Sequence, residues 1–230
     1  LERFLARVES YNPALNAIIW MDRAGARKRA RQADAALAKG ELWGPLHGLP
    51  MTVKEAFDLA GSPSTWGVPA WRDNIAKTDS VLVARLKTAG AVIFGKTNVP
   101  LNLGDWQTFN AIHGSTRNPW NSDLVPGGSS GGSAAALAAG LTAAEAGSDI
   151  GSSIRNPAHY TGTFGHKPTW GVISQRGHAP PGWLQQTDIG VVGPMARSAR
   201  DLELMLGVLG GADPLDADAW TLALAKPRLK

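Results

Sequence analysis

The sequence has no cysteine and no long hydrophobic run. Without cysteine, disulfide bonds, thiolate metal sites, iron–sulfur clusters and a cysteine nucleophile are all excluded. The longest run of small apolar residues, 134–144, is far shorter than the roughly 20 residues that a membrane span needs, and the amino-terminal LERFLARVES does not resemble a secretion signal. We therefore expect a cytoplasmic protein without a membrane partner.

Charged residues are also scarce, at 18% of the chain against an average of about 25%. A hydrophobic share of 43% and a length of 230 residues are typical of a globular protein that buries a core of its own. The net charge is +4, and much of the basic excess lies in 23–31 (RAGARKRAR), a pattern that favours a solvated helix face over a nucleic-acid site. We expect one domain over residues 1–230 and no nucleic-acid partner.

Apolar spacing and turn residues predict an alternation of helices and strands. Helices are predicted before Asn12-Pro13, then over 22–39, 79–89, the alanine-rich 134–139, 198–209 and 213–230, with Asp22, Asp79 and Ser198 as N-caps. Strands are predicted over 15–21, 51–57 and 91–94. This order is typical of a single mixed α/β unit.

Two short motifs point to functions that their surroundings do not support. Residues 90–97 (GAVIFGKT) match the phosphate-loop pattern, but the residues between the glycines are themselves a predicted strand, and no helix follows. The tract 127–132 (GGSSGG) contains the G-x-S-x-G pattern of a hydrolase nucleophile elbow, at Ser129 and at Ser130, without a distinguishable base histidine after it. Neither nucleotide binding nor an elbow-type hydrolase is expected.

The histidines do not form a metal-binding pattern. No HExxH motif or His/Asp cluster with metal-ligand spacing is present, so neither a metal nor another cofactor is expected. For the five histidines we expect surface or capping roles: His47, His113, His159, His166 and His178.

Three polar residues stand in settings that suit nucleophilic chemistry. Lys54 lies in the predicted apolar strand 51–57, where lost hydration lowers the pKa of an ammonium group and frees the amine to act as a base. Ser153 follows 150–152 at a predicted helix start, where several backbone N–H groups can converge on one oxygen and stabilise an oxyanion. Because a serine hydroxyl both donates and accepts, Ser129 can relay a proton between base and nucleophile.

The segments PGGSSGGSAAALAAG, from Pro126, and GSDIGSSIR, from Gly147, resemble the amidase signature family of serine hydrolases. The likeness covers about residues 46–199 and includes, in order, HGLPMTVKEAF, FGKTNVP, NPW and GPMARSARDLE. The gaps of 75 positions from Lys54 to Ser129 and of 24 from Ser129 to Ser153 also agree with that family. The resemblance implies the amidase signature fold, an α/β fold with a mixed β-sheet core flanked by helices on both faces.

Carried over to this sequence, the resemblance assigns Lys54 as the base, Ser129 as a relay that follows a cis peptide bond, and Ser153 as the nucleophile. The implied oxyanion hole is formed by backbone N–H groups of Ile150, Gly151, Ser152 and Ser153. Supporting roles are implied for Ser130, Asp149 and Arg155, whose alternative is a purely local stabilisation of the turns. The implied activity is hydrolysis of a small carboxamide, and the same triad also suits carbamates and esters.

Two features depart from the family. Ser152 stands where a second glycine is usual, so a positive φ there would strain the backbone. Family members are about twice as long, so we expect the fold to be truncated on its carboxyl-terminal side and part of the pocket to be absent. We also expect a partner, which is either another copy of the chain or the missing half.

Two further functions stay open. The chain could be a glutamine amidotransferase subunit, which would have stable partner chains, or a catalytically idle fragment that serves as an interaction module. An apolar, aromatic substrate channel is a further expectation, because six tryptophans lie in or beside predicted loops: Trp66, Trp71, Trp106, Trp120, Trp170 and Trp183. For any one of them, an ordinary core or surface position is the alternative.

Overall fold

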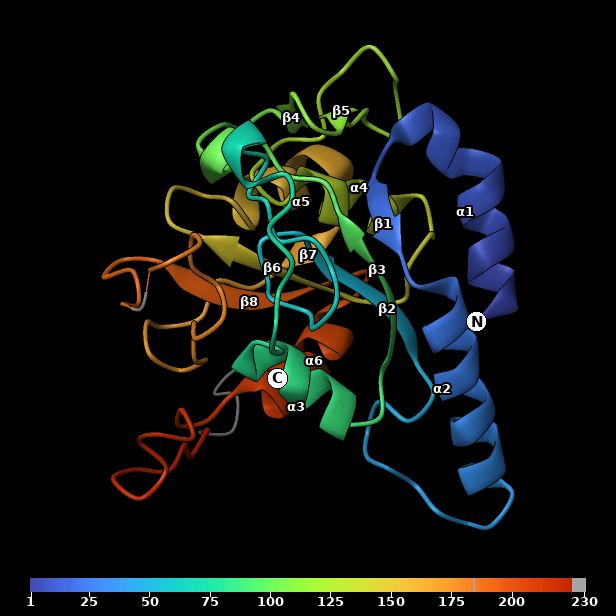
Figure 1. The fold of residues 1–230 in the computed structure, drawn as a ribbon, viewed down its shortest axis with the longest axis vertical. Coiled ribbons are helices and arrows are strands. Elements are labelled where there is room, and N and C mark those ends of the chain that lie inside the picture. Colours follow the sequence, from blue (N-terminus) through green and yellow to red (C-terminus); the bar gives the residue numbers. More distant parts are fainter. Residues whose placement is uncertain (184, 225–230) are drawn as a thin grey trace.

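The computed structural model describes residues 1–183 and 185–224, in which helices and short strands alternate (Figure 1). The helices are α1 (Glu2–Leu15), α2 (Arg23–Leu37), α3 (Val81–Thr88), α4 (Gly131–Ala138), α5 (Arg155–Thr161) and α6 (Ala199–Leu209). The strands are β1 (Ile18–Met21), β2 (Pro50–Lys54), β3 (Val92–Thr97), β4 (Phe109–Asn110), β5 (Gly114–Ser115), β6 (Glu145–Asp149), β7 (Phe164–Gly165) and β8 (Val191–Ala196). The predicted α/β class is confirmed.

The strands form mixed and antiparallel sheets. In the sheet ordered β1-β3-β2, β3 pairs antiparallel with β1 and parallel with β2. The sheet ordered β6-β8-β7 is antiparallel throughout, and β4 and β5 form a separate short pair. β2 lies next to β6, so the two three-stranded sheets meet along these two strands, from Thr52 beside Glu145 to Lys54 beside Ser148.

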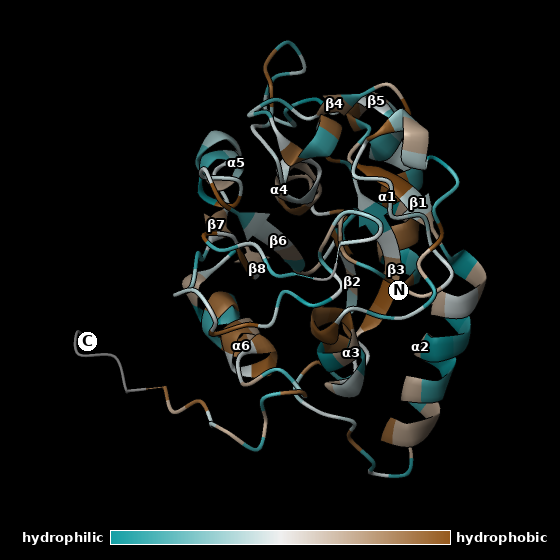
Figure 2. Cartoon of the chain, turned by 60° about the vertical axis from the view of Figure 1, so that its left-hand side comes forward, coloured by the Kyte–Doolittle hydropathy of each residue, from teal (hydrophilic) through white to brown (hydrophobic). Residues whose placement is uncertain are grey.

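Helices cover both faces of the strands, as the resemblance implied (Figure 1). On one side, α3 and α6 pack against β2 and β8 in a core that includes Met51, Val53, Leu82, Leu86, Val192, Met205 and Leu209. On the other side, α1, α2 and α4 pack against β1 and β3 through Leu5, Val8, Ile18, Ala26, Val92, Phe94 and Ala135. The basic stretch 23–31 lies on α2, whose outer side is largely hydrophilic in Figure 2 and whose Arg27 pairs with Glu2 of α1.

Two predicted helix ends are wrong. α1 continues through Pro13 to Leu15. It ends at Asn16, which adopts a left-handed conformation and donates its N–H to the Asn12 carbonyl. α3 is capped by the Ser80 hydroxyl, which accepts from the Val83 N–H, while Asp79 pairs with Lys87. The caps predicted at Asp22 and Ser198 are confirmed.

The predicted helix 213–230 is also wrong over its described part. Residues 213–224 form turns and irregular structure, and 225–230 lie outside the described residues. The Asp213 carboxylate accepts from the Leu215 N–H and pairs with Arg176, so it stabilises a turn. No helix among the described residues is long and apolar enough to cross a membrane.

Candidate active site

Lys54 is the last residue of β2 and is fully buried. In the parallel pairing with β3 it lies in register with Thr97, whose hydroxyl donates to the Val53 carbonyl. The chain turns immediately afterwards, because the Phe57 N–H donates to the Lys54 carbonyl, and the strand is therefore shorter than the predicted 51–57. β2 thus places the side-chain amine of Lys54 where the two sheets meet.

The glycine-rich loop 126–132 brings Ser129 to the same place. A Cβ at Gly128 would lie 2.4 Å from the Asp105 carbonyl oxygen, and one at Gly132 would lie 2.4 Å from the Asn98 nitrogen. Only glycine permits such close backbone approaches. The peptide bond between Gly128 and Ser129 is cis, as the resemblance implied, and Ser129 is buried.

The amine and the first serine are hydrogen-bonded. Lys54 Nζ lies 2.7 Å from Ser129 Oγ and 2.9 Å from Ser148 Oγ. Burial lowers the pKa of Lys54 to about 7, although the acidic side chains of Asp149 and Glu145 oppose this shift. A large fraction of the amine is therefore neutral near pH 7, as a base requires.

Ser153 lies in the turn between β6 and α5, which Asp149 holds in shape. The carboxylate of Asp149 accepts from the N–H groups of Ser152 and Ile154, both at 3.0 Å, and forms a two-point ion pair with Arg155 at 2.9 and 3.1 Å. Burial by itself would raise the pKa of Asp149, but the hydrogen bonds from Arg155 and Ile154 outweigh it and hold that pKa below its usual value. Asp149 and Arg155 therefore brace the turn.

Ser130 joins the two serine-bearing segments. Its N–H donates to the Ser153 carbonyl at 3.0 Å, and its buried hydroxyl lies 3.4 Å from both the nitrogen and the carbonyl oxygen of Ser148. Among the hydrogen bonds of the described residues, none joins the hydroxyls of Ser129 and Ser153, although both serines line one cavity.

The backbone donors of the turn divide into two groups. The Ser152 N–H is held by the Asp149 carboxylate. Over the described residues, the N–H groups of Ile150, Gly151 and Ser153 make no hydrogen bond outside helices and strands. Ser152 has φ +75°, so the strained conformation that glycine would relieve is present and is occupied by a serine.

A cavity of about 110 Å³ opens beside these residues. Three of its lining residues, Trp66, Asn102 and Leu103, have φ between +49° and +56°. With Ser152, they are four of the five non-glycine residues with positive φ in the described chain. Such conformations each cost about 1–3 kcal/mol and gather at functional sites.

The predicted tryptophan channel is present only in small part. Trp66 lines the cavity, and Trp106 donates its indole N–H to the Gly151 carbonyl at 2.8 Å. Trp120, Trp170 and Trp183 are exposed and, like Trp71, do not line this cavity.

Two residues of the site escaped prediction from the sequence. Ser148, the second partner of Lys54, stands within the quoted GSDIGSSIR segment, and strand alternation there could have pointed to it. His178 lines the cavity and is only 9% exposed, so the expected surface or capping role is wrong for this histidine. A single histidine in a glycine- and proline-rich segment carries no sequence signal for burial.

A family model described as Amidase matches residues 1–227, so the chain belongs to the amidase family. The chain is 44% identical over 214 residues to a glutamyl-tRNA(Gln) amidotransferase subunit of Azoarcus sp., covering 93% of this chain and 43% of the relative. It is 42% identical to the indoleacetamide hydrolase of Bradyrhizobium diazoefficiens, covering 94% of this chain and 42% of the relative.

A solved structure shares this fold with a TM-score of 0.88 and 40% identity. It is described as a vestigial protein complex that reveals the origins of an s-triazine catabolic enzyme, and the match covers 93% of this chain and 46% of that one. The chain therefore spans less than half the length of these relatives.

Proposed function

We propose that the chain hydrolyses a carboxamide C–N bond, with Ser153 as the nucleophile, Ser129 as the proton relay and Lys54 as the base. The observation that carries the proposal is the buried pair of Lys54 Nζ and Ser129 Oγ at 2.7 Å, beside the cavity that Ser153 lines. Membership of the amidase family and the similarity to an indoleacetamide hydrolase support the same reaction class.

In the first half of the reaction, Ser153 Oγ bonds to the carbonyl carbon of the substrate while its proton passes to Ser129 Oγ. The proton of Ser129 passes at the same time to neutral Lys54 Nζ. The carbonyl oxygen becomes an oxyanion, for which the N–H groups of Ile150, Gly151 and Ser153 are the proposed donors, since that of Ser152 is held by Asp149.

In the second half, the C–N bond breaks and the leaving amine takes a proton from Ser129, which regains one from Lys54. Water then attacks the acyl-enzyme by the same relay, which releases the acid and restores the hydroxyl of Ser153. The Ser129–Ser153 hydrogen bond has to form when substrate binds, as catalytic contacts in free enzymes often do. The supporting roles of Ser130, Asp149 and Arg155 are to hold the two turns together.

The test is labelling by a fluorophosphonate, which phosphonylates only activated serines: the serine oxygen bonds to phosphorus and fluoride leaves. We expect one adduct, mapped to Ser153 by peptide mass, that disappears in Lys54→Ala and Ser129→Ala. Ser122→Ala, on an exposed loop, is a control that leaves labelling unchanged. A folded chain without any adduct would contradict the proposal and favour an idle interaction module.

A second candidate is the subunit of a glutamine amidotransferase, because amidotransferase subunits are among the most similar relatives. It shares the proposed chemistry but takes glutamine as the amide and needs partner chains. Release of ammonia from glutamine, together with stable partner chains in a native purification, would favour it. Carbamate or ester substrates, a cytoplasmic location, and association with another copy or with a missing half stay predictions.

A further inference from the structure

Two buried polar atoms without a hydrogen-bond partner lie in residues that line the cavity beside Ser153. Among the described residues, three buried side-chain nitrogens lack a partner: Trp66 Nε1, His113 Nε2 and His178 Nε2. Trp66 and His178 both line this cavity, whereas His113 does not. An unpartnered buried polar group costs about 1–3 kcal/mol and is rare in folded proteins, so two at one cavity need a reason.

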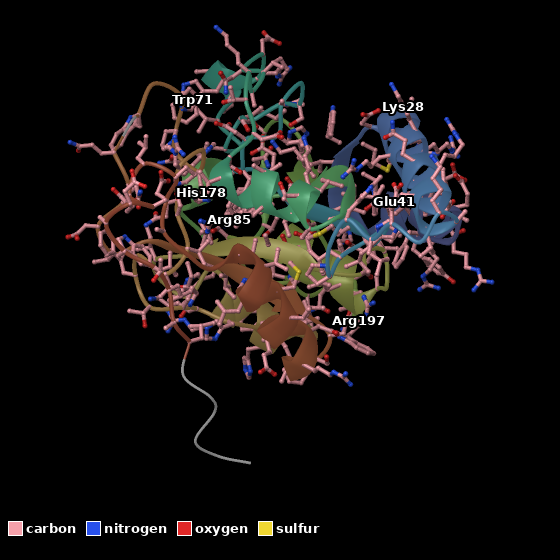
Figure 3. The ribbon with its side chains drawn as sticks, turned by 90° about the horizontal axis from the view of Figure 1, so that it is seen from below. Lys28, Glu41, Trp71, Arg85, His178 and Arg197 are labelled. Atoms are coloured by element: carbon pink, nitrogen blue, oxygen red, sulfur yellow. The ribbon has the colours of Figure 1, made fainter. Side chains whose placement is uncertain are left out.

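Packing gives these two side chains a fixed place. The His178 ring lies against Phe57 and Trp66, with ring centroids 4.8 and 5.0 Å apart. The segment that contains His178 is hydrogen-bonded to α3, because the Val81 N–H donates to the Arg176 carbonyl. Figure 3 labels His178 beside this helix. Neither ring takes part in the proton transfers of Lys54, Ser129 and Ser153.

The chemistry of the two groups limits what they can bind. An indole N–H is a donor only, and a neutral imidazole nitrogen donates or accepts according to its tautomer. Burial and the nearby charge of Lys54 lower the pKa of His178 to about 3, so this ring is neutral near pH 7. The pair therefore suits a neutral group that carries a hydrogen-bond acceptor, and the ring of His178 offers no charge to an anion.

The size of the cavity sets the second limit. Its volume of about 110 Å³ is somewhat below that of an apolar cavity of about 150 Å³ that holds benzene. Leu103, Ile150 and Val191 contribute apolar wall. One flat ring partly inside the cavity, with its carboxamide at Ser153, agrees with both limits.

We propose that this subsite selects a small neutral carboxamide whose ring or short chain carries a hydrogen-bond acceptor, recognised by Trp66 Nε1 and His178 Nε2. The role of the bound amide as substrate rests on the proposed function. The recognition itself does not, and binding can test it without turnover.

The experiment compares pyridine-3-carboxamide with benzamide, which differ by one ring nitrogen. Binding to the ¹⁵N-labelled chain is followed by NMR at backbone amide signals in every variant, and also at the indole N–H signal of Trp66, which is assigned by its loss in Trp66→Phe. We expect the pyridine amide to bind about tenfold more tightly, as one added hydrogen bond allows, and to move this signal downfield. Trp66→Phe and His178→Phe should bring the two affinities within about twofold, while His113→Phe, the matched control, keeps the preference.

Three results would overturn the proposal: equal binding of the two amides, no binding of either, or a preference that survives both substitutions in folded variants. Fluorophosphonate labelling of Ser153, measured on the same preparation of protein, tests the proposed reaction independently of the subsite. A preference for the ring nitrogen without labelling would support the subsite and contradict the reaction. Labelling without the preference would support the reaction and contradict the subsite.

Discussion

Replacing Lys54 by methionine should stabilise the protein at low pH while removing its proposed activity. The side chain is fully buried, and burial lowers its pKa from 10.5 to about 7. Because the folded-state pKa is the lower one, the unfolded chain binds more protons between these two values, and stability rises with pH across that window. Methionine fills a similar space without a charge to bury.

The drop in pKa from 10.5 to about 7 corresponds to about 5 kcal/mol of unfavourable free energy when the amine is charged in both states. Methionine also loses the hydrogen bonds to Ser129 and Ser148, which together contribute about 1–3 kcal/mol. Lys54→Met should therefore be more stable than the parent by about 2–4 kcal/mol near pH 6. The difference should fall to about zero near pH 9.5, where most of the charge penalty is gone.

Urea unfolding followed by tryptophan fluorescence at these two pH values measures the effect. Lys87→Met is the matched control, because Lys87 is partly exposed and pairs with Asp79. Its loss should change stability by no more than about 1 kcal/mol at either pH. A Lys54→Met variant that is less stable than the parent at the lower pH, or whose difference from the parent does not change with pH, would refute the reasoning.

Three other predictions follow from the site. Asp149→Asn should lower the free energy of unfolding by about 1–3 kcal/mol in urea titrations and slow labelling of Ser153, because the turn loses its charged acceptor; an unchanged labelling rate would contradict this. Gly128→Ala should lower the free energy of unfolding by about 1–3 kcal/mol, because its methyl group would lie 2.4 Å from a carbonyl oxygen. Gly151→Ala, whose methyl group has no atom within 4 Å, should change it by no more than about 0.5 kcal/mol. Equal losses in the two variants would contradict this prediction. The labelling rate should rise with pH and reach half its maximum near pH 7, as Lys54 loses its proton, and a rate that is the same on both sides of that pH would oppose the assignment of the base.

The positions of the three proposed catalytic residues could be predicted because each is fixed by local backbone chemistry. Lys54 ends a strand of buried residues, and Ser129 stands in a loop whose glycines are required by close backbone contacts. These constraints are visible as short motifs. The likeness to a known family then supplied roles that spacing alone would not give.

The cavity wall could not be predicted in the same way. His178 and Trp66 become neighbours only through the packing of segments more than 100 residues apart, and neither has a local pattern that indicates burial. The helix predicted over 213–230 is wrong over its described part, 213–224, for a related reason. Asp213 has the character of an N-cap, but its partners Ser174 and Arg176 come from a distant segment and stabilise a turn instead.

The turn that bears Ser153 is held mainly through main-chain N–H groups, which converge on the carboxylate of Asp149. A scaffold of this kind constrains the path of the backbone and leaves the side chain at position 152 free to differ, provided that the residue accepts φ +75°. A serine can therefore stand in place of the usual glycine while Asp149 still accepts from the N–H groups on either side of Ser153. A search for relatives that demands two glycines here would overlook chains with the same geometry, whereas a search for the aspartate and serine four positions apart would retain them.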